Sequence, residues 1–137
     1  MPSRRKAREL ALQMLFQWDV GQNAPAQIIH TFLEPRNLDD ETASFARALF
    51  EGTVNEAGAL DAVARAHAEH WRVERMAAVD RNIIRLALYE LSHVSENPPA
   101  VVINEALELA RRFSSVDSVD FINGVLDAAR KAASAGL

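Results

Sequence analysis

The chain has 137 residues, of which 49% are hydrophobic and 25% are charged, so we expect a single soluble domain, residues 1–137, with a true core. It contains no cysteine, which excludes disulfides, zinc–thiolate sites and thiol catalysis. The net charge of −4 argues against a polycation that coats nucleic acid. No apolar run approaches the roughly 20 residues that span a bilayer, so we expect a cytoplasmic protein without membrane contact.

The first two predicted elements are helices. Apolar residues recur at helical spacing over residues 3–20, Ser3 is a good N-cap for this segment, and Gly21 stops it. A short helix is predicted between Pro25 and Pro35.

The next helix is long, and Asp39 and Asp40 can cap it. We expect a kink at Gly58 and a continuation over residues 60–70. Residues 79–91 are apolar almost all round, which is typical of a helix at the centre of a bundle.

Two amphipathic helices complete the chain. Residues 97–99, Asn-Pro-Pro, break the chain, and residues 102–113 form the first of these helices. Asp117 is predicted to cap the last helix. The fold class is therefore all-α, a helical bundle.

The first helix has a second face that is basic and aromatic. Four basic residues against two acidic ones give the first twenty residues a net charge of +2, and the remainder carries −6. At roughly 100° per residue, four side chains fall on or near the side opposite the apolar stripe; these are Arg5, Arg8, Leu12 and Phe16, with Arg4 and Lys6 flanking them.

This face suits contact with nucleic acid. Guanidinium groups pair with phosphates, and an exposed ring stacks a base for about 1–3 kcal/mol. Three alternatives stay open on the residues alone. The face is a solvated charged surface, another helix covers Leu12 and Phe16, or the face serves self-association.

Little in the sequence supports catalysis or metal binding. The carboxylates of residues 39–41 are better explained as helix caps than as an acid/base pair, and Ser92 and His93 are merely adjacent. His67 and His70 have helical spacing but lack a third ligand nearby. We therefore predict no enzyme activity, no metal and no cofactor.

Phe121 lies just inside the last predicted helix, one turn after Asp117. The residues alone favour a core aromatic. If Phe121 instead projects near the first helix, it and Phe16 form two stacking platforms beside the arginines.

Three segments together resemble the NusB family of bacterial transcription antitermination factors: RRKARELALQMLFQWDV, VDRNIIRLALYEL and INEALELA…DFINGVLDAA. The likeness runs over nearly the whole chain, in order. It implies an all-α fold of about six to seven helices in two packed subdomains, without catalytic activity. It also implies binding of boxA RNA in nascent ribosomal RNA transcripts together with NusE, a small-subunit ribosomal protein, within an antitermination complex on RNA polymerase.

The resemblance also implies the residues of the interface. Its arginine-rich motif falls on Arg4, Arg5, Lys6 and Arg8, and its following aromatic, often tyrosine, falls on Phe16. A Trp-x-x-x-Arg element implies an RNA contact at Arg75, and an Asp-Ser…Phe-x-Asn-Gly motif implies contacts at Asp117, Ser118 and Phe121. Asp80 is a candidate acidic contact for NusE. Phenylalanine at position 16 keeps a stacking face and loses a hydroxyl donor.

Two rival functions are compatible with the sequence. One is a stand-alone relative of the NusB-like domain that precedes the catalytic domain of certain ribosomal RNA cytosine methyltransferases. The chain has no glycine-rich cofactor-binding region and no catalytic cysteine. We therefore expect no methyl transfer by this chain even if it is such a relative. The other is a homodimeric helical adaptor that uses the Leu12 and Phe16 face for self-association.

Overall fold

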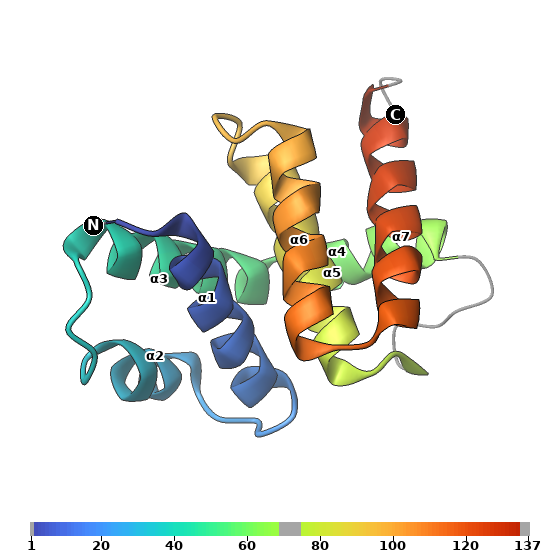
Figure 1. Cartoon of the computed structure of the whole chain (residues 1–137). Helices are drawn as coiled ribbons and strands as arrows, with labels where there is room; N and C mark the ends of the chain where they lie inside the picture. Colours follow the sequence, from blue (N-terminus) through green and yellow to red (C-terminus); the bar gives the residue numbers. More distant parts are fainter. Residues whose placement is uncertain (1, 69–74, 135–137) are drawn as a thin grey trace.

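The computed structural model describes residues 2–68 and 75–134, and these residues form seven α-helices without a β-strand (Figure 1). The helices are α1 (Arg4–Asp19), α2 (Pro25–Leu33), α3 (Asp40–Asn55), α4 (Ala57–His67), α5 (Ala78–His93), α6 (Pro99–Phe113) and α7 (Val116–Ser134). The predicted all-α fold is confirmed. No described helix is long and apolar enough to cross a membrane.

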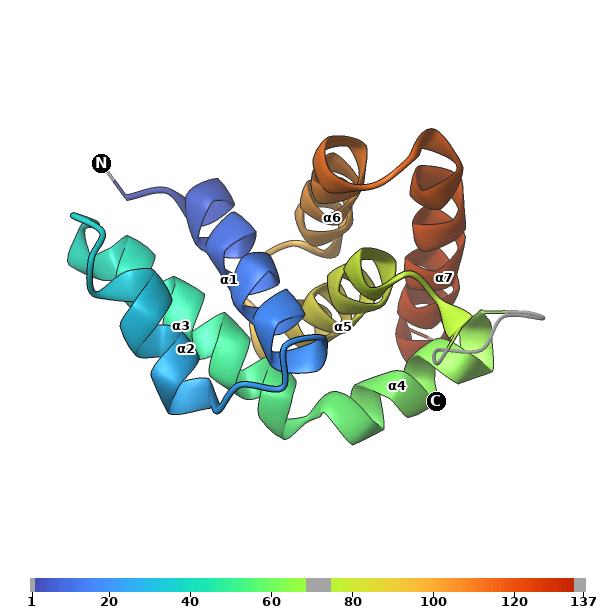
Figure 2. The same cartoon turned by 90° about the horizontal axis from the view of Figure 1, so that it is seen from below.

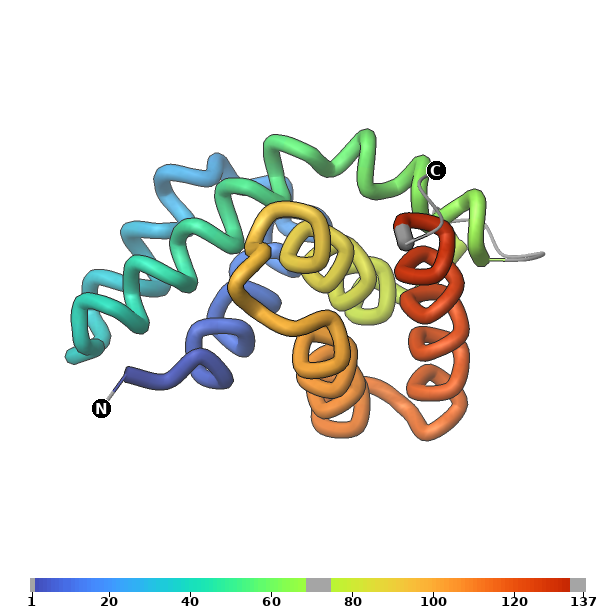
Figure 3. Tube along the Cα trace, turned by 90° about the horizontal axis from the view of Figure 1, so that it is seen from above, coloured from blue at the N-terminus to red at the C-terminus, as the bar shows by residue number. Residues whose placement is uncertain are grey.

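The helices form two groups of mutual contacts. Helices α1, α2 and α3 pack on one another, and α4 to α7 form the second group (Figure 2). Helix α5 contacts α1 and α3 from the first group and α4, α6 and α7 from the second. Seen from above, α5 lies in the middle, surrounded by the helices it contacts (Figure 3). This arrangement agrees with the two packed subdomains that the resemblance implies.

Helix α5 is the centre of the core, as its apolar pattern predicts. Its buried apolar side chains are Ile83, Ile84, Leu86, Ala87 and Leu88. It also buries three polar side chains, Asn82, Arg85 and Glu90, which the pattern does not explain. A buried charge is costly unless a partner of opposite charge lies beside it. Arg85 and Glu90 therefore hold side chains of other helices in fixed positions.

The ends of the helices match the predicted caps in part. The Ser3 hydroxyl accepts a hydrogen bond from the Lys6 N–H at 3.0 Å, which confirms the first N-cap. The predicted cap at Asp117 is wrong, because the Ser115 hydroxyl accepts from the Ser118 N–H at 3.2 Å and α7 begins at Val116.

The break between α3 and α4 also differs from the predicted kink at Gly58. The chain leaves the helical conformation at Glu56, where φ is −102° and ψ is 7°. Helix α4 therefore begins at Ala57, and Gly58 lies in its first turn.

A polar cluster joins α1, α4 and α5. Asp19 accepts hydrogen bonds from Arg81, Asn82 and Arg85, and Arg85 also donates to both carboxylate oxygens of Asp61, at 2.7 and 2.8 Å. Burial raises the pKa of Asp19, but the hydrogen bonds from Arg81 and Asn82 outweigh burial, so its pKa lies below the usual value. The cluster fixes the end of α1 against α5.

Candidate nucleic-acid interface

Arg8 is a core residue, so the prediction that it projects from an exposed face is wrong. Its side chain is 6% exposed, and its Nε and Nη2 donate to the two carboxylate oxygens of Glu90 at 2.9 and 2.5 Å. Glu90 is itself 2% exposed and accepts a further hydrogen bond from Asn97 at 2.7 Å. Because its guanidinium is buried and paired with Glu90, we leave Arg8 out of the interface.

Helix α1 is buried on two sides, which explains the position of Arg8. The apolar stripe packs within the first group of helices, and the other side meets α5. Leu12 is buried as well, so the alternative that another element covers it is correct for Leu12. It is not correct for Phe16, whose exposed fraction is 38%.

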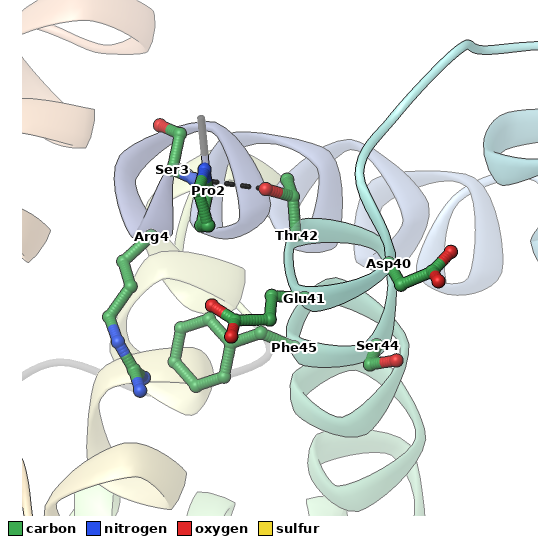
Figure 4. Close-up of a pocket in the computed structure, with 8 residues that line it drawn as sticks. All are labelled: Pro2, Ser3, Arg4, Asp40, Glu41, Thr42, Ser44 and Phe45. Carbon is green, nitrogen blue, oxygen red and sulfur yellow. Dashed lines mark hydrogen bonds between the residues drawn. The ribbon is translucent and has the colours of Figure 1, made fainter.

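The start of α1 presents three exposed cationic side chains, Arg4, Arg5 and Lys6. The Arg4 guanidinium lies 4.3 Å from the centre of the Phe45 ring on α3, a cation–π contact (Figure 4). Arg5 pairs with Glu105 on α6. Within residues 2–68 and 75–134, Lys6 has no carboxylate partner, so its charge is open to a phosphate.

A hollow of about 490 Å³ lies where α1 and α3 begin (Figure 4). The Ser3 N–H donates to the Thr42 hydroxyl at 2.9 Å and ties the two helix starts together. Asp40 and Glu41 also line this hollow. The negative charge of Asp40 and Glu41 makes this hollow a poor site for a phosphate, in contrast to the exposed cationic side chains at the start of α1.

Phe16 forms one wall of an apolar groove of about 350 Å³ between α1, α2, α5 and α6. Four further apolar side chains line the groove, and two glutamines add amide groups to it; these residues are Leu12, Phe32, Val79, Phe113, Gln13 and Gln17. An apolar wall with an exposed ring can stack a nucleobase, and amides can hydrogen-bond its edge.

Asp80 and Ser118, predicted from separate motifs, are in direct contact. The Ser118 hydroxyl donates to one carboxylate oxygen of Asp80 at 2.7 Å, and the Ser114 hydroxyl donates to the other at 2.6 Å. Asp80, at the start of α5, therefore holds the turn between α6 and α7 in place. Asp117 is exposed beside it, and Phe121 is half-buried against the core, as the core alternative expected in part.

The Phe16 groove adjoins this turn. Val79 and Phe113 line the groove, and they directly precede Asp80 and Ser114 in the chain. The structure thus brings Phe16 to the same end of the molecule as Ser118, although the two residues are far apart in the sequence.

Arg75 is exposed and lies just before α5. Trp71, the other member of its predicted element, lies outside the described residues, as does His70 of the histidine pair. Within residues 2–68 and 75–134, no group of three or more His, Asp or Glu side chains could hold a metal ion.

Sequence reasoning missed Arg111 and Arg112 at the end of α6. Arg112 pairs with Glu9 of α1, and Arg111 pairs with Glu108 at 2.5 Å. The signal was present, because Arg111, Arg112 and Phe113 place two arginines beside an aromatic, as on the first helix. The end of α6 therefore adds two arginines beside α1, both of them paired with carboxylates within the protein.

Ser92 and His93 are joined by a hydrogen bond of 2.8 Å, and His93 also meets Glu56 at 3.0 Å. This is closer than sequence adjacency alone indicated. However, the Ser92 hydroxyl also donates to the Leu88 carbonyl at 2.9 Å. The Ser92 hydroxyl proton is hydrogen-bonded to a helix carbonyl, so the imidazole does not accept it. The contact with His93 stabilises the end of α5 and does not activate Ser92 as a nucleophile.

Comparison with known proteins identifies the family. The model of the NusB family matches residues 5–131. The chain belongs to the NusB family. This confirms the resemblance drawn from the three segments. The NusB family comprises transcription antitermination proteins and is not enzymatic, so the chain functions in transcription antitermination and the expectation of a non-enzyme is confirmed.

Individual relatives agree over most of the chain. The transcription antitermination protein NusB of Koribacter versatilis is 54% identical over 126 residues, covering 91% of this chain and 86% of the relative. That of Solibacter usitatus is 48% identical over 133 residues, covering 96% and 90%. The matches therefore cover most of the length of both relatives.

Solved structures give the same NusB fold. T. maritima NusB superposes with a TM-score of 0.88 at 32% identity, covering 96% of this chain and 93% of that chain. A crystal structure of the antitermination factors NusB and NusE in complex with dsRNA matches with a TM-score of 0.86 at 26% identity, covering 94% and 96%. A structural homologue of this chain thus binds NusE and RNA.

Proposed function

We propose that this NusB-family chain binds single-stranded boxA-type RNA of nascent ribosomal RNA transcripts together with NusE. The bound pair then joins an antitermination complex on RNA polymerase in the cytoplasm. The chain acts as one RNA-binding unit over residues 1–137. The observation that carries the proposal is the exposed Phe16 ring on an apolar groove, with exposed cations at the start of the same helix.

The proposed RNA surface has three parts. Arg4 and Lys6 at the start of α1 contact phosphates, because exposed cationic groups supply the sequence-independent part of binding. Arg5 can contact a phosphate only in exchange for its ion pair with Glu105. Phe16 stacks a base in its groove. Arg75 adds a further exposed guanidinium before α5.

The turn between α6 and α7 completes the surface. Asp117 accepts hydrogen bonds from base amino groups, and Ser118 positions this turn through Asp80. The half-buried Phe121 offers a second ring. Asp80 accepts hydrogen bonds from two serine hydroxyls. We therefore assign it two roles: it supports the turn between α6 and α7, and it contacts NusE.

NusE is needed because the basic surface is small on a protein of net charge −4. A partner that brings its own RNA contacts raises affinity through effective concentration without new chemistry in this chain. The match to a NusB–NusE complex with dsRNA supports this partner.

The test is binding of a labelled boxA-type RNA, alone and with NusE, against a scrambled RNA of the same length. We expect NusE to tighten binding of the boxA-type RNA only. Phe16→Ala should cost about 1–3 kcal/mol of binding. Val20→Ala is the matched control, because it removes an exposed apolar side chain at the end of the same helix without removing a ring. Equal binding of both RNAs would refute the proposal.

The groove at Phe16 also favours a second candidate, a homodimer through this face. An exposed aromatic ring on an apolar groove is typical of a surface that a partner covers. Sedimentation with and without RNA separates the two candidates, since a dimer closed through Phe16 should dissociate when RNA binds. A monomer at all concentrations would exclude the homodimer.

A further inference from the structure

The groove between α1 and α6 is rich in arginine and nevertheless neutralised. It has a volume of about 270 Å³, and four arginines and three glutamates line it. Every one of these arginines reaches a carboxylate: Arg5 pairs with Glu105, Arg8 with Glu90, Arg111 with Glu108 and Arg112 with Glu9. The basic surface next to the proposed RNA face is therefore already paired within the protein.

The pair of Arg5 and Glu105 crosses from α1 to α6 and uses the full fork of the guanidinium. Nε of Arg5 donates to one carboxylate oxygen at 3.1 Å, and Nη2 donates to the other at 2.9 Å. This two-point geometry is the one by which arginine binds a phosphate. Glu105 thus occupies the donors that an RNA phosphate would use.

The two partners differ in exposure. The Arg5 side chain is 62% exposed, and the Glu105 side chain is 17% exposed. Glu105 also has a second cationic neighbour, since Nη1 of Arg8 lies 3.7 Å from its carboxylate. Arg5 therefore has open space on its solvent side, whereas Glu105 lies between Arg5 and Arg8.

Glu105 stays charged in this position. The hydrogen bond from Arg5 lowers the pKa of Glu105, and burial opposes this effect only in part. If Arg5 moves to a phosphate, a charged and mostly buried carboxylate loses its best partner. The exchange therefore returns less free energy than a free arginine would gain from the same phosphate.

We propose that Glu105 is a specificity-determining residue for RNA binding. It holds the guanidinium of Arg5 in the place of an RNA phosphate and so limits sequence-independent affinity. Base contacts elsewhere on the surface then decide which RNA is bound. The inference rests on the proposed function, whose RNA surface includes Arg5.

The test is the salt dependence of binding to a scrambled single-stranded RNA, for the wild type and for Glu105→Gln. Freeing one arginine for one phosphate should steepen the slope of log K against log salt by about 0.7, equivalent to about fivefold tighter binding at 0.1 M salt. The matched control is Glu51→Gln, which removes the same charge and releases Arg47 from an exposed ion pair on α3, outside the groove.

A double variant, Glu105→Gln with Arg5→Gln, identifies the cause. If Glu105 acts by holding Arg5, the double variant loses the gain and returns to the shallow slope. A Glu105→Gln variant that behaves like Glu51→Gln, that binds more weakly than the wild type, or that keeps its gain without Arg5 would overturn the proposal.

The same series keeps the two proposals apart. Preference of the wild type for boxA-type RNA tests the proposed function. The slopes on scrambled RNA test Glu105. A wild type without preference, together with an Arg5-dependent gain in Glu105→Gln, would refute the function and retain the charge pairing.

Discussion

The buried pair of Arg8 and Glu90 gives the sharpest prediction about stability. In Arg8→Met the aliphatic stem is retained, and the two hydrogen bonds to Glu90 are lost. Among the described residues, Asn97 is then the one remaining hydrogen-bond donor to a Glu90 carboxylate that is almost fully buried. Removing one partner of a buried ion pair costs about 3–5 kcal/mol, because the other charge is left uncompensated.

This magnitude converts into a melting temperature. A chain of 137 residues unfolds with an entropy of about 0.29 kcal/mol/K near 60 °C, so the expected fall in Tm is about 10–17 °C. Arg5→Met is the control, since Arg5 is exposed and solvent screens its ion pair, so we expect little change in Tm.

Calorimetry or thermal circular dichroism measures both variants. The double variant Arg8→Met with Glu90→Leu should recover most of the lost stability, because it removes the unpaired charge as well. If Arg8→Met melts within about 2 °C of the wild type and binds RNA more weakly, Arg8 is a surface contact and the reasoning is refuted.

Three further predictions concern the fold. Gly52→Ala should destabilise the fold by about 1–3 kcal/mol, because the new Cβ would lie 2.1 Å from Cζ of Tyr89. Gly124→Ala has open space around its Cβ and should stabilise the fold by about 0.5–1 kcal/mol. Equal Tm shifts of the two variants would contradict this. Thr53→Val should raise stability by about 1 kcal/mol, because within the described part of the chain the buried Thr53 hydroxyl has no hydrogen-bond partner, and a lower Tm would show that it has one. The lowered pKa of Asp19 stabilises the fold above pH of about 4, and this contribution is lost as pH falls through the folded pKa, so Asp19→Asn should flatten the acid limb of a Tm–pH profile and an unchanged limb would argue against it.

The helices could be predicted because local signals determine them. The apolar pattern of residues 79–91 places α5 at the centre, and Ser3 marks the start of α1. The boundary at Asp117 failed because two candidate caps stand two residues apart, and only the geometry selects Ser115.

The interface could be predicted only in part. Helical periodicity shows that Arg8 lies opposite the apolar stripe, but it does not show what packs there, and its partner Glu90 is 82 residues away. Arg112 likewise depends on Glu9, 103 residues distant. Contacts at such separations follow from the packing of whole helices. The same periodicity placed Phe16 on one face with Arg8 and Leu12, and the packing of the other helices leaves Phe16 exposed while it buries the other two.

If RNA contacts the start of α1, the Phe16 groove and the turn between α6 and α7, backbone amide chemical shifts will show it as boxA-type RNA is added to the labelled protein. We expect the largest shifts at Lys6, at Phe16 and at Ser118, whereas scrambled RNA should shift Lys6 alone. Shifts confined to α4 and the outer face of α3, with these three amides unmoved, would refute these contacts.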